Sequence, residues 1–429
     1  MASPPAIEPI SPVPPAGTRE PGRFAFRELG DQVGVFLSTL AINFAVFAIL
    51  FLASLKLPAP EFAKLSLAAG LVPVVASILD LGTTQSCLKL SFECDDVRFL
   101  GFNLAVKTVF LALTLPAAGA AYWLGVEVNR IAIGAAGAGM AFWGAMRILE
   151  HRKREFRRLA WLNLSVALSR LAFGAAALVT QSLALILIAL YVVAQLPAHL
   201  VSVRRAKDVL STVRWSDAPM IMKISPVMFA SGLLYGSLPV LTQSLVYARN
   251  DAAAASAMGV VAMFLAPLGL IATTLRAYIL PEVLDKPLRS IRVFGVEKSG
   301  LVWVVGVFVL ALVLGTAFGA VCIHFIYDQR FPQATTFFLI YFGATAIALP
   351  IGLLNVRAQR GSLVRIEALV NAARFGATAA LALFAEMSPV TVVAVSAAIL
   401  VIGEIALAAL LTQASARSAP RAFSARGRG

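Results

Sequence analysis

The chain has 429 residues, of which 59% are hydrophobic and 14% are charged, and its formal net charge is +14. A soluble domain is typically about 45–50% apolar and about 25% charged, so this composition excludes an ordinary soluble globule and indicates a polytopic membrane protein. The basic residues lie between apolar runs, and we therefore interpret the positive charge as loop charge that sets membrane topology, not as a nucleic-acid surface.

The chain begins with a proline-rich stretch, "MASPPAIEPISPVPPAG", which lacks the early basic region and apolar core of a signal peptide. We expect residues 1–30 to form a disordered cytoplasmic tail. Apolar runs of the roughly 20 residues that a membrane span needs then follow one another. About twelve are expected: 33–56, 62–88, 98–124, 130–149, 159–180, 182–203, 224–247, 252–279, 299–325, 333–356, 362–385 and 389–412.

The distribution of Lys and Arg gives an independent prediction of topology. With the N-terminus inside, the cytoplasmic loops carry most of the cations, including the run "RKREFRR" at 152–158, and the outside loops carry few. Both termini are then cytoplasmic. The sequence therefore predicts an all-α protein with an N-terminal six-helix lobe at 31–203, a cytoplasmic linker at 204–223, a C-terminal six-helix lobe at 224–412 and a basic tail at 413–429. Transporters are often built from such repeats, with the site at their interface.

Several ionisable residues interrupt the apolar spans, where a charge is costly unless it faces the bundle interior or water. They are Asp80, Lys107, Arg170, Glu367, Arg374 and Glu404. A helical rise of about 1.5 Å per residue places them between the cytoplasmic surface and the midplane, as expected for a vestibule open to the cytoplasm. Helical spacing adds Asn163 to the face of Arg170 and Asn371 to the face of Arg374.

Two interpretations of these charges remain open. Asp80 and Lys107 lie at similar depth on adjacent antiparallel spans, so they either pair with each other or take part in ion coupling. Arg170 and Arg374 come from different lobes, and arginine suits an anionic ligand such as phosphate. We therefore take Arg170, Arg374, Lys107, Asn163 and Asn371 as candidate substrate-binding residues. Asp80, Glu367 and Glu404 are candidates for ion coupling or for structural pairing.

The sequence contains no pattern typical of an enzyme. It has no paired-carboxylate loop, nucleophile–His arrangement or Gly-rich phosphate loop, and its three cysteines have no metal-type spacing. We expect no catalytic residue, no metal and no cofactor. A membrane-embedded glycan polymerase or glycosyltransferase stays as an alternative, although such enzymes generally need a substantial loop or domain outside the membrane.

One segment resembles a known family. The stretch "LPAPEFAKLSLAAGLVPVVASILDLGTTQSCLKLSFE" (57–93) contains a short proline loop from Pro58 to Phe62 and then Asp80-Leu81-Gly82, and "YILPEV" lies at 278–283. These features resemble Wzx-type polysaccharide or O-antigen flippases of the multidrug/oligosaccharidyl-lipid/polysaccharide (MOP) exporter superfamily. The family usually has an apolar residue after the Asp-Leu-Gly motif, where this chain has Thr83.

The resemblance implies a multi-pass flippase of the bacterial inner membrane. Its substrate would be an undecaprenyl-pyrophosphate-linked oligosaccharide for surface polysaccharide, carried by alternating access of two lobes around a partly cationic cavity. The implied partners are this lipid-linked oligosaccharide, membrane lipids, H+ or Na+ as a coupling ion, and polysaccharide assembly proteins, without nucleic acid. The nearest alternative is a cation-coupled multidrug or small-molecule antiporter of the same superfamily.

Overall fold

The computed structural model describes residues 21–94, 96–152, 155–249, 251–265, 298–355, 363–384 and 386–418. These residues form helices and short connections, and none of them is in a β-strand. Ten of the helices in the described ranges are long and apolar enough to cross a membrane, and two shorter apolar helices cover Ala252–Leu265 and Leu312–Tyr327. The prediction of an all-α multi-pass protein is therefore confirmed. The motif at 278–283 lies outside the described residues.

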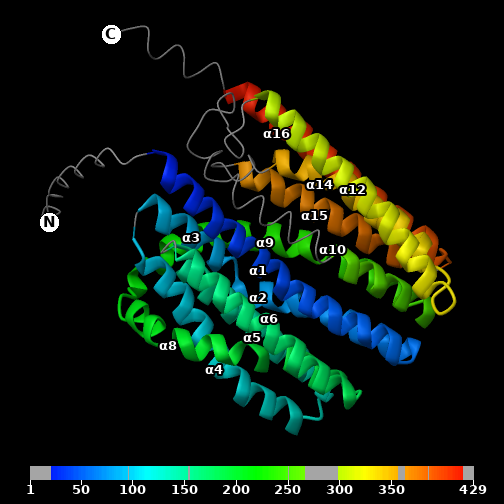
Figure 1. Cartoon of the computed structure of the whole chain (residues 1–429), viewed down its shortest axis with the longest axis horizontal. Coiled ribbons are helices and arrows are strands. Elements are labelled where there is room, and N and C mark those ends of the chain that lie inside the picture. The colour runs from blue at the N-terminus through cyan, green and yellow to red at the C-terminus, as the bar shows by residue number, and fades with distance from the viewer. Residues whose placement is uncertain are drawn as a thin grey trace, which may run out of the picture.

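The described residues of the N-terminal lobe form eight α-helices. They are α1 (Pro21–Lys56), α2 (Ala59–Asp80), α3 (Thr83–Glu93), α4 (Arg98–Trp123), α5 (Val128–Arg152), α6 (Phe156–Val179), α7 (Leu183–Tyr191) and α8 (Leu196–Leu210). Helix α1 packs along α6, and α5 packs against both α2 and α4 (Figure 1). The predicted span 182–203 is thus made by α7 and α8, and α8 continues into the predicted linker.

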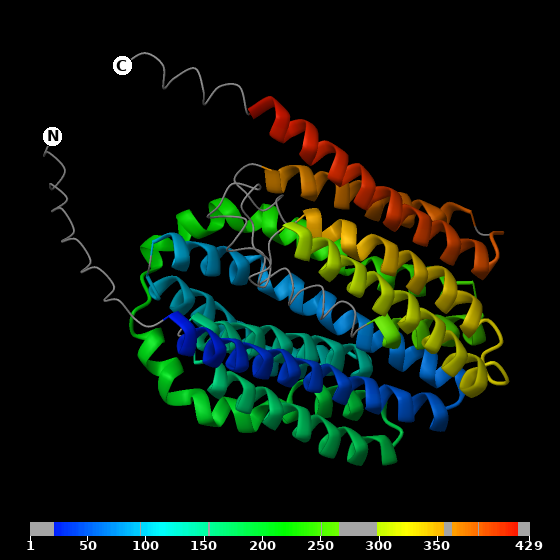
Figure 2. The same cartoon turned by 45° about the horizontal axis from the view of Figure 1, so that its top comes forward.

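The C-terminal lobe begins with α9 (Ala218–Gly236) and α10 (Leu238–Tyr247), followed by the helix Ala252–Leu265. Next come α12 (Lys298–Tyr327), α13 (Ala334–Phe337), a π-helical turn (Phe338–Phe342), α14 (Gly343–Leu354), α15 (Val364–Ala380) and α16 (Pro389–Ser418). Helix α15 packs against α9 and α16, and α14 also packs against α16. In Figure 2 the yellow-to-red helices lie together on one side of the blue-to-green N-terminal lobe.

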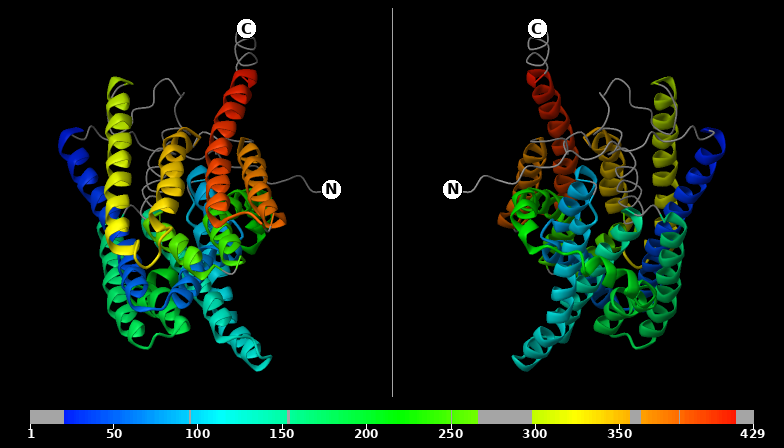
Figure 3. Two further views of the ribbon diagram at one scale, coloured as in Figure 1. Left: turned by 90° about the vertical axis from the view of Figure 1, so that its right-hand side faces the viewer. Right: turned by 90° about the vertical axis from the view of Figure 1, so that its left-hand side faces the viewer.

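Large apolar side chains cover much of the outer surface. The second half of α4 projects from the bundle (Figure 3), and Leu115 and Trp123 on it are 80% and 86% exposed. Phe325 of α12 and Leu383 after α15 are exposed to a similar extent, at 81% and 83%. A soluble protein would not expose so much apolar surface, whereas lipid tails solvate it readily. The distribution therefore fits helices that face a bilayer.

The second predicted span, 62–88, is wrong as a single helix. Helix α2 ends at Asp80 and α3 begins at Thr83, because Leu81 and Gly82 both take left-handed backbone angles, with φ of 51° and 70°. This conformation costs about 1–2 kcal/mol for an L-residue such as Leu81. Gly82 is needed for a second reason, since a Cβ there would lie 2.7 Å from the Phe229 backbone nitrogen of α9. The break is thus a point where the two lobes touch.

The lobes also join tightly at the end of the bundle where α1 ends and α2 begins, which the topology places outside. The largest apolar core contains residues of both lobes, from Ile49 of α1 to Val393 of α16. Polar contacts between the lobes accompany it, among them Ser54 Oγ with Tyr327 Oη (2.7 Å), Gln243 Nε2 to Ser66 Oγ (2.7 Å), Ser256 Oγ to the Ala59 carbonyl (2.7 Å) and Arg330 Nη1 to the Leu55 carbonyl (2.6 Å). The predicted outside end is therefore closed in this conformation.

Candidate functional site

The first cluster of intramembrane polar groups lies at the break between α2 and α3. Lys107, on α4, is only 1% exposed, and its Nζ lies 3.0 Å from Asp80 Oδ1. Thr84 Oγ1 also donates a hydrogen bond to Asp80, and Thr83 Oγ1 donates to Asn103 Oδ1 at 2.9 Å. Of the two roles that the sequence left open for Asp80 and Lys107, this structure shows the ion pair.

The second cluster lies inside the C-terminal lobe, on the polar face of α15 that helical spacing predicted. Arg374 Nη1 lies 3.0 Å from Glu404 Oε1 of α16, and the two side chains are 2% and 1% exposed. Arg374 also donates to Asn371 Oδ1 at 3.0 Å, and Asn371 Nδ2 donates to Ser231 Oγ at 3.1 Å. Asn355 Nδ2 donates to Glu404 Oε2 at 2.7 Å. In this conformation the charge of Arg374 is neutralised by Glu404 and not offered to a ligand.

The third cluster lies inside the N-terminal lobe and has a different charge balance. Arg170 of α6 is 5% exposed, and it donates to the Leu190 carbonyl at 2.9 Å and to the Ile42 carbonyl at 3.4 Å. Its guanidinium group also lies over the Tyr191 ring, 5.3 Å from the centroid. No carboxylate in the described part of the chain lies within ion-pair distance of Arg170.

Asn163 and a second arginine extend this cluster. Asn163 lies about two turns before Arg170 on the same face of α6, and its Nδ2 donates to Thr39 Oγ1 at 3.1 Å. Arg147 of α5 donates to the same Thr39 oxygen at 3.2 Å, again without a carboxylate partner among the described residues. Arg147 is not among the candidate residues predicted from the sequence. It stands near the end of the predicted span 130–149, where a cation is also expected as an ordinary flanking residue.

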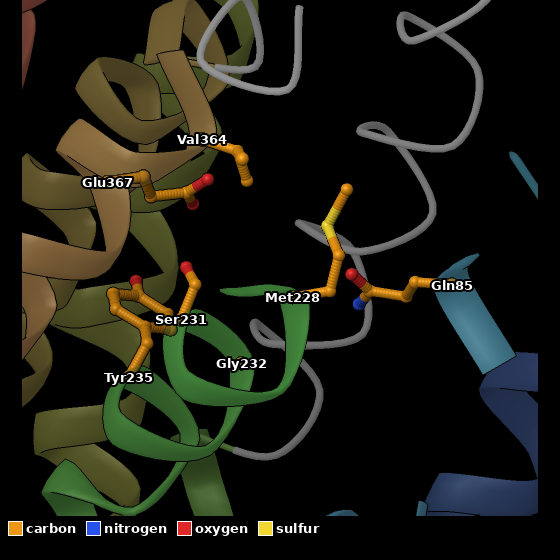
Figure 4. Close-up of a pocket in the computed structure, with 7 residues that line it drawn as sticks. All are labelled: Gln85, Met228, Ser231, Gly232, Tyr235, Val364 and Glu367. Atoms are coloured by element: carbon orange, nitrogen blue, oxygen red, sulfur yellow. The ribbon is translucent and has the colours of Figure 1, made fainter. Parts of the chain in front are cut away.

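A small cavity of about 60 Å³ lies between the lobes, bordered by α3, α9 and α15. Figure 4 shows Gln85 of α3 on one side, Met228 and Ser231 of α9 in the middle, and Glu367 of α15 on the other. Of the candidate residues only Glu367, which is 9% exposed, lines this cavity. Arg170 and Arg374 do not line this cavity, and each arginine is buried in its own lobe.

The described residues contain no group of three or more His, Cys, Asp or Glu side chains that could hold a metal ion. The three clusters consist of charged side chains, some ion-paired and some not, inside a helical bundle. Polar clusters of this kind inside membrane helices are typical of transport pathways.

The chain has the fold of solved MATE transporters over nearly its whole length. An inward-facing multidrug resistance MATE transporter of the MOP superfamily superposes with a TM-score of 0.59 at 10% identity, covering 92% of this chain and 99% of that one. The eukaryotic MATE transporter AtDTX14 gives 0.58 at 10% identity, with 90% and 96% covered. The Vibrio cholerae transporter VcmN gives 0.53 at 11% identity, with 93% and 99% covered. No protein-family model and no curated protein matches the sequence.

Proposed function

We propose that the protein is a flippase that moves an undecaprenyl-pyrophosphate-linked oligosaccharide across the bacterial inner membrane for surface polysaccharide biosynthesis. The resemblance of residues 57–93 to polysaccharide flippases and the MATE fold both support this proposal. A large anionic headgroup cannot cross about 30 Å of hydrocarbon unaided. The two lobes would give it a polar path while its lipid tail stays in the bilayer.

The observation that carries the proposal is the charge balance inside the bundle. Asp80 and Glu404 each contact a basic partner, at 3.0 Å in both pairs. Arg147 and Arg170 have no carboxylate partner in the described ranges, so the interior of the N-terminal lobe is positive. An interior with surplus cations favours an anionic substrate such as a pyrophosphate. A pump for cationic drugs would need a carboxylate that is available to its substrate, and of Asp80, Glu367 and Glu404 only Glu367 lines the inter-lobe cavity.

The substrate path follows from which end is closed. The polar contacts and the shared apolar core seal the predicted outside end, and the inter-lobe cavity of about 60 Å³ has room for only a few water molecules. A glycan headgroup is far larger, so it would enter when α3 separates from α9 and α15 at the cytoplasmic side. H+ or Na+ coupling would act through Asp80, Glu367 or Glu404, and polysaccharide assembly proteins would supply and receive the substrate.

A multidrug antiporter is the second candidate, because one of the compared structures is a multidrug resistance transporter with this fold. The two candidates differ in the sign of the substrate charge. The paired state of Asp80 and Glu404 disfavours a cationic substrate, whereas the unpaired arginines of the N-terminal lobe favour an anionic one.

The experiment measures translocation of a pyrophosphate-linked glycolipid in proteoliposomes that contain equal amounts of each variant. Arg147→Gln and Arg170→Gln together should lower the flux at least roughly tenfold, which corresponds to about 1.4 kcal/mol. Arg130→Gln is the matched control, since its side chain is 74% exposed in the predicted outside turn. Unchanged flux in the double variant would contradict the role of the two arginines. No glycolipid flux in any of the three proteins, together with efflux of a cationic dye, would favour the antiporter instead.

A further inference from the structure

At the break between α2 and α3, main-chain carbonyl oxygens do not accept the intrahelical hydrogen bonds that they would accept in a continuous helix. The last carbonyl groups of a helix have no partner within it. At the end of α2 the carbonyl oxygens of Leu79 and Asp80 lie 3.1 and 2.8 Å from Lys107 Nζ. Thr83 Oγ1, at the start of α3, lies 2.8 Å from the same nitrogen. With Asp80 Oδ1 at 3.0 Å, four oxygens from a five-residue stretch surround one ammonium group, whose side chain is 0% exposed.

These four oxygens are the kind of ligand that a monovalent cation binds. Two are backbone carbonyls, one is a hydroxyl and one is a carboxylate, all hard oxygen donors. Unwound backbone carbonyls at broken membrane helices serve as cation ligands in transporters. Their distances of 2.8–3.1 Å suit an ammonium or a potassium-sized ion and are long for sodium.

We propose that the break is a monovalent-cation site whose resident cation is the chain's own Lys107 ammonium. Because this ammonium group is covalently attached to α4, the site is occupied without any ion from solution. It holds Leu81 and Gly82 in their left-handed conformation, and this conformation sets Gly82 against the α9 backbone. Lys107 is therefore a positioning residue for the contact between α3 and α9. This role of Lys107 does not depend on which substrate the protein carries.

A simple ion pair between Lys107 and Asp80 makes a different prediction. In an ion pair the carboxylate is the essential partner, so Asp80→Asn and Lys107→Ala would have similar effects. In a cation site, two main-chain carbonyls and Thr83 Oγ1 remain when the carboxylate is neutralised. Asp80→Asn should then be clearly milder than Lys107→Ala in its effect on thermal unfolding.

The test is a cation titration of the full-length Lys107→Ala protein, purified in ammonium buffer and then exchanged into choline. Its unfolding midpoint should fall below that of the wild type in choline. Ammonium or K+ should restore the midpoint along a single-site saturation curve, because a ligand that binds only the folded state stabilises it. Na+ at equal concentration should restore it much less. The wild type, whose site is occupied, should not respond.

Lys107→Met is the matched control, because its side chain fills the space without donating a hydrogen bond and should show no rescue. A second readout is the distance between spin labels at Gln85 of α3 and Met222 of α9, with the three native cysteines replaced by serine. The distance distribution should broaden in Lys107→Ala and narrow again with ammonium.

Three outcomes would overturn the proposal. The first is a Lys107→Ala protein as stable as the wild type in choline. The second is an equal response of the Lys107→Ala, Lys107→Met and wild-type proteins to every salt. If Lys107→Ala does not fold even in ammonium, Thr83→Val replaces it as the test variant, because it keeps the lysine and removes one of the four oxygens. The third outcome is then an unfolding midpoint and spin-label distances in Thr83→Val that equal those of the wild type.

Discussion

Neutralising both members of the Arg374–Glu404 pair should destabilise the protein by less than the sum of the losses caused by neutralising each member alone. Arg374 Nη1 and Glu404 Oε1 are 3.0 Å apart, and the two side chains are 2% and 1% exposed. Water therefore cannot replace the partner of either charge. Removing one partner of such a pair typically costs about 3–5 kcal/mol, because the other charge stays buried. Arg374→Met would leave Glu404 with the amide of Asn355, at 2.7 Å. Glu404→Gln would leave the arginine with Asn371.

The assay is a double-mutant cycle on unfolding of the purified protein in detergent. Arg374→Met combined with Glu404→Gln removes both charges, and its loss should be smaller than the sum of the single losses by roughly 1–3 kcal/mol. The exposed pair Arg130–Glu127, 3.3 Å apart with side chains 74% and 70% exposed, is the control and should show little coupling. Single losses close to zero, or strict additivity in the buried pair, would refute this reasoning.

Two further predictions concern the contacts between the lobes. Gly82→Ala should destabilise the protein by roughly 1–3 kcal/mol more than Gly125→Ala: both glycines have positive φ, but only Gly82 lacks space for a Cβ. Equal shifts in thermal unfolding would argue against a lobe contact at the break. Tyr327→Phe removes the 2.7 Å hydrogen bond to Ser54 and should weaken the closed outside end by about 1 kcal/mol. An Ala63→Cys reporter in the shared apolar core, with the native cysteines replaced, should then react faster with an impermeant thiol reagent, and an unchanged rate would contradict the role of this hydrogen bond in closing the outside end.

Much of the fold was predictable because a bilayer imposes a strict length and polarity on each span. The polar face of α15 was equally predictable, since residues three and four apart share a helix face. Glu367, Asn371, Arg374 and Thr378 are all buried, as this spacing implies. The pairing of Asp80 with Lys107 also followed from similar depth on adjacent spans.

Other features depend on information that hydropathy does not carry. The break at Leu81 and Gly82 is a change of backbone φ within an apolar run, so the run reads as one helix. The partner of Arg374 depends on how α15 and α16 are rotated about their axes, which spacing within one helix does not define. Arg147 escaped notice because a cation at a span end is normal. Whether Arg147 belongs to the polar cluster depends on the packing of α1 and α6 beside it, because these helices carry Thr39 and Arg170.

Flippase activity can be measured as translocation by the wild-type protein in liposomes that carry a fluorescent polyprenyl-linked oligosaccharide. Access of an impermeant glycosidase to the label reports the leaflet. If the protein is a flippase for pyrophosphate-linked glycans, the pyrophosphate-linked form should exchange between leaflets well above the rate in protein-free liposomes, and a neutral glycolipid with the same glycan should not. Equal rates for both glycolipids, or no exchange together with efflux of a cationic dye, would show that the protein is not a flippase for pyrophosphate-linked glycans.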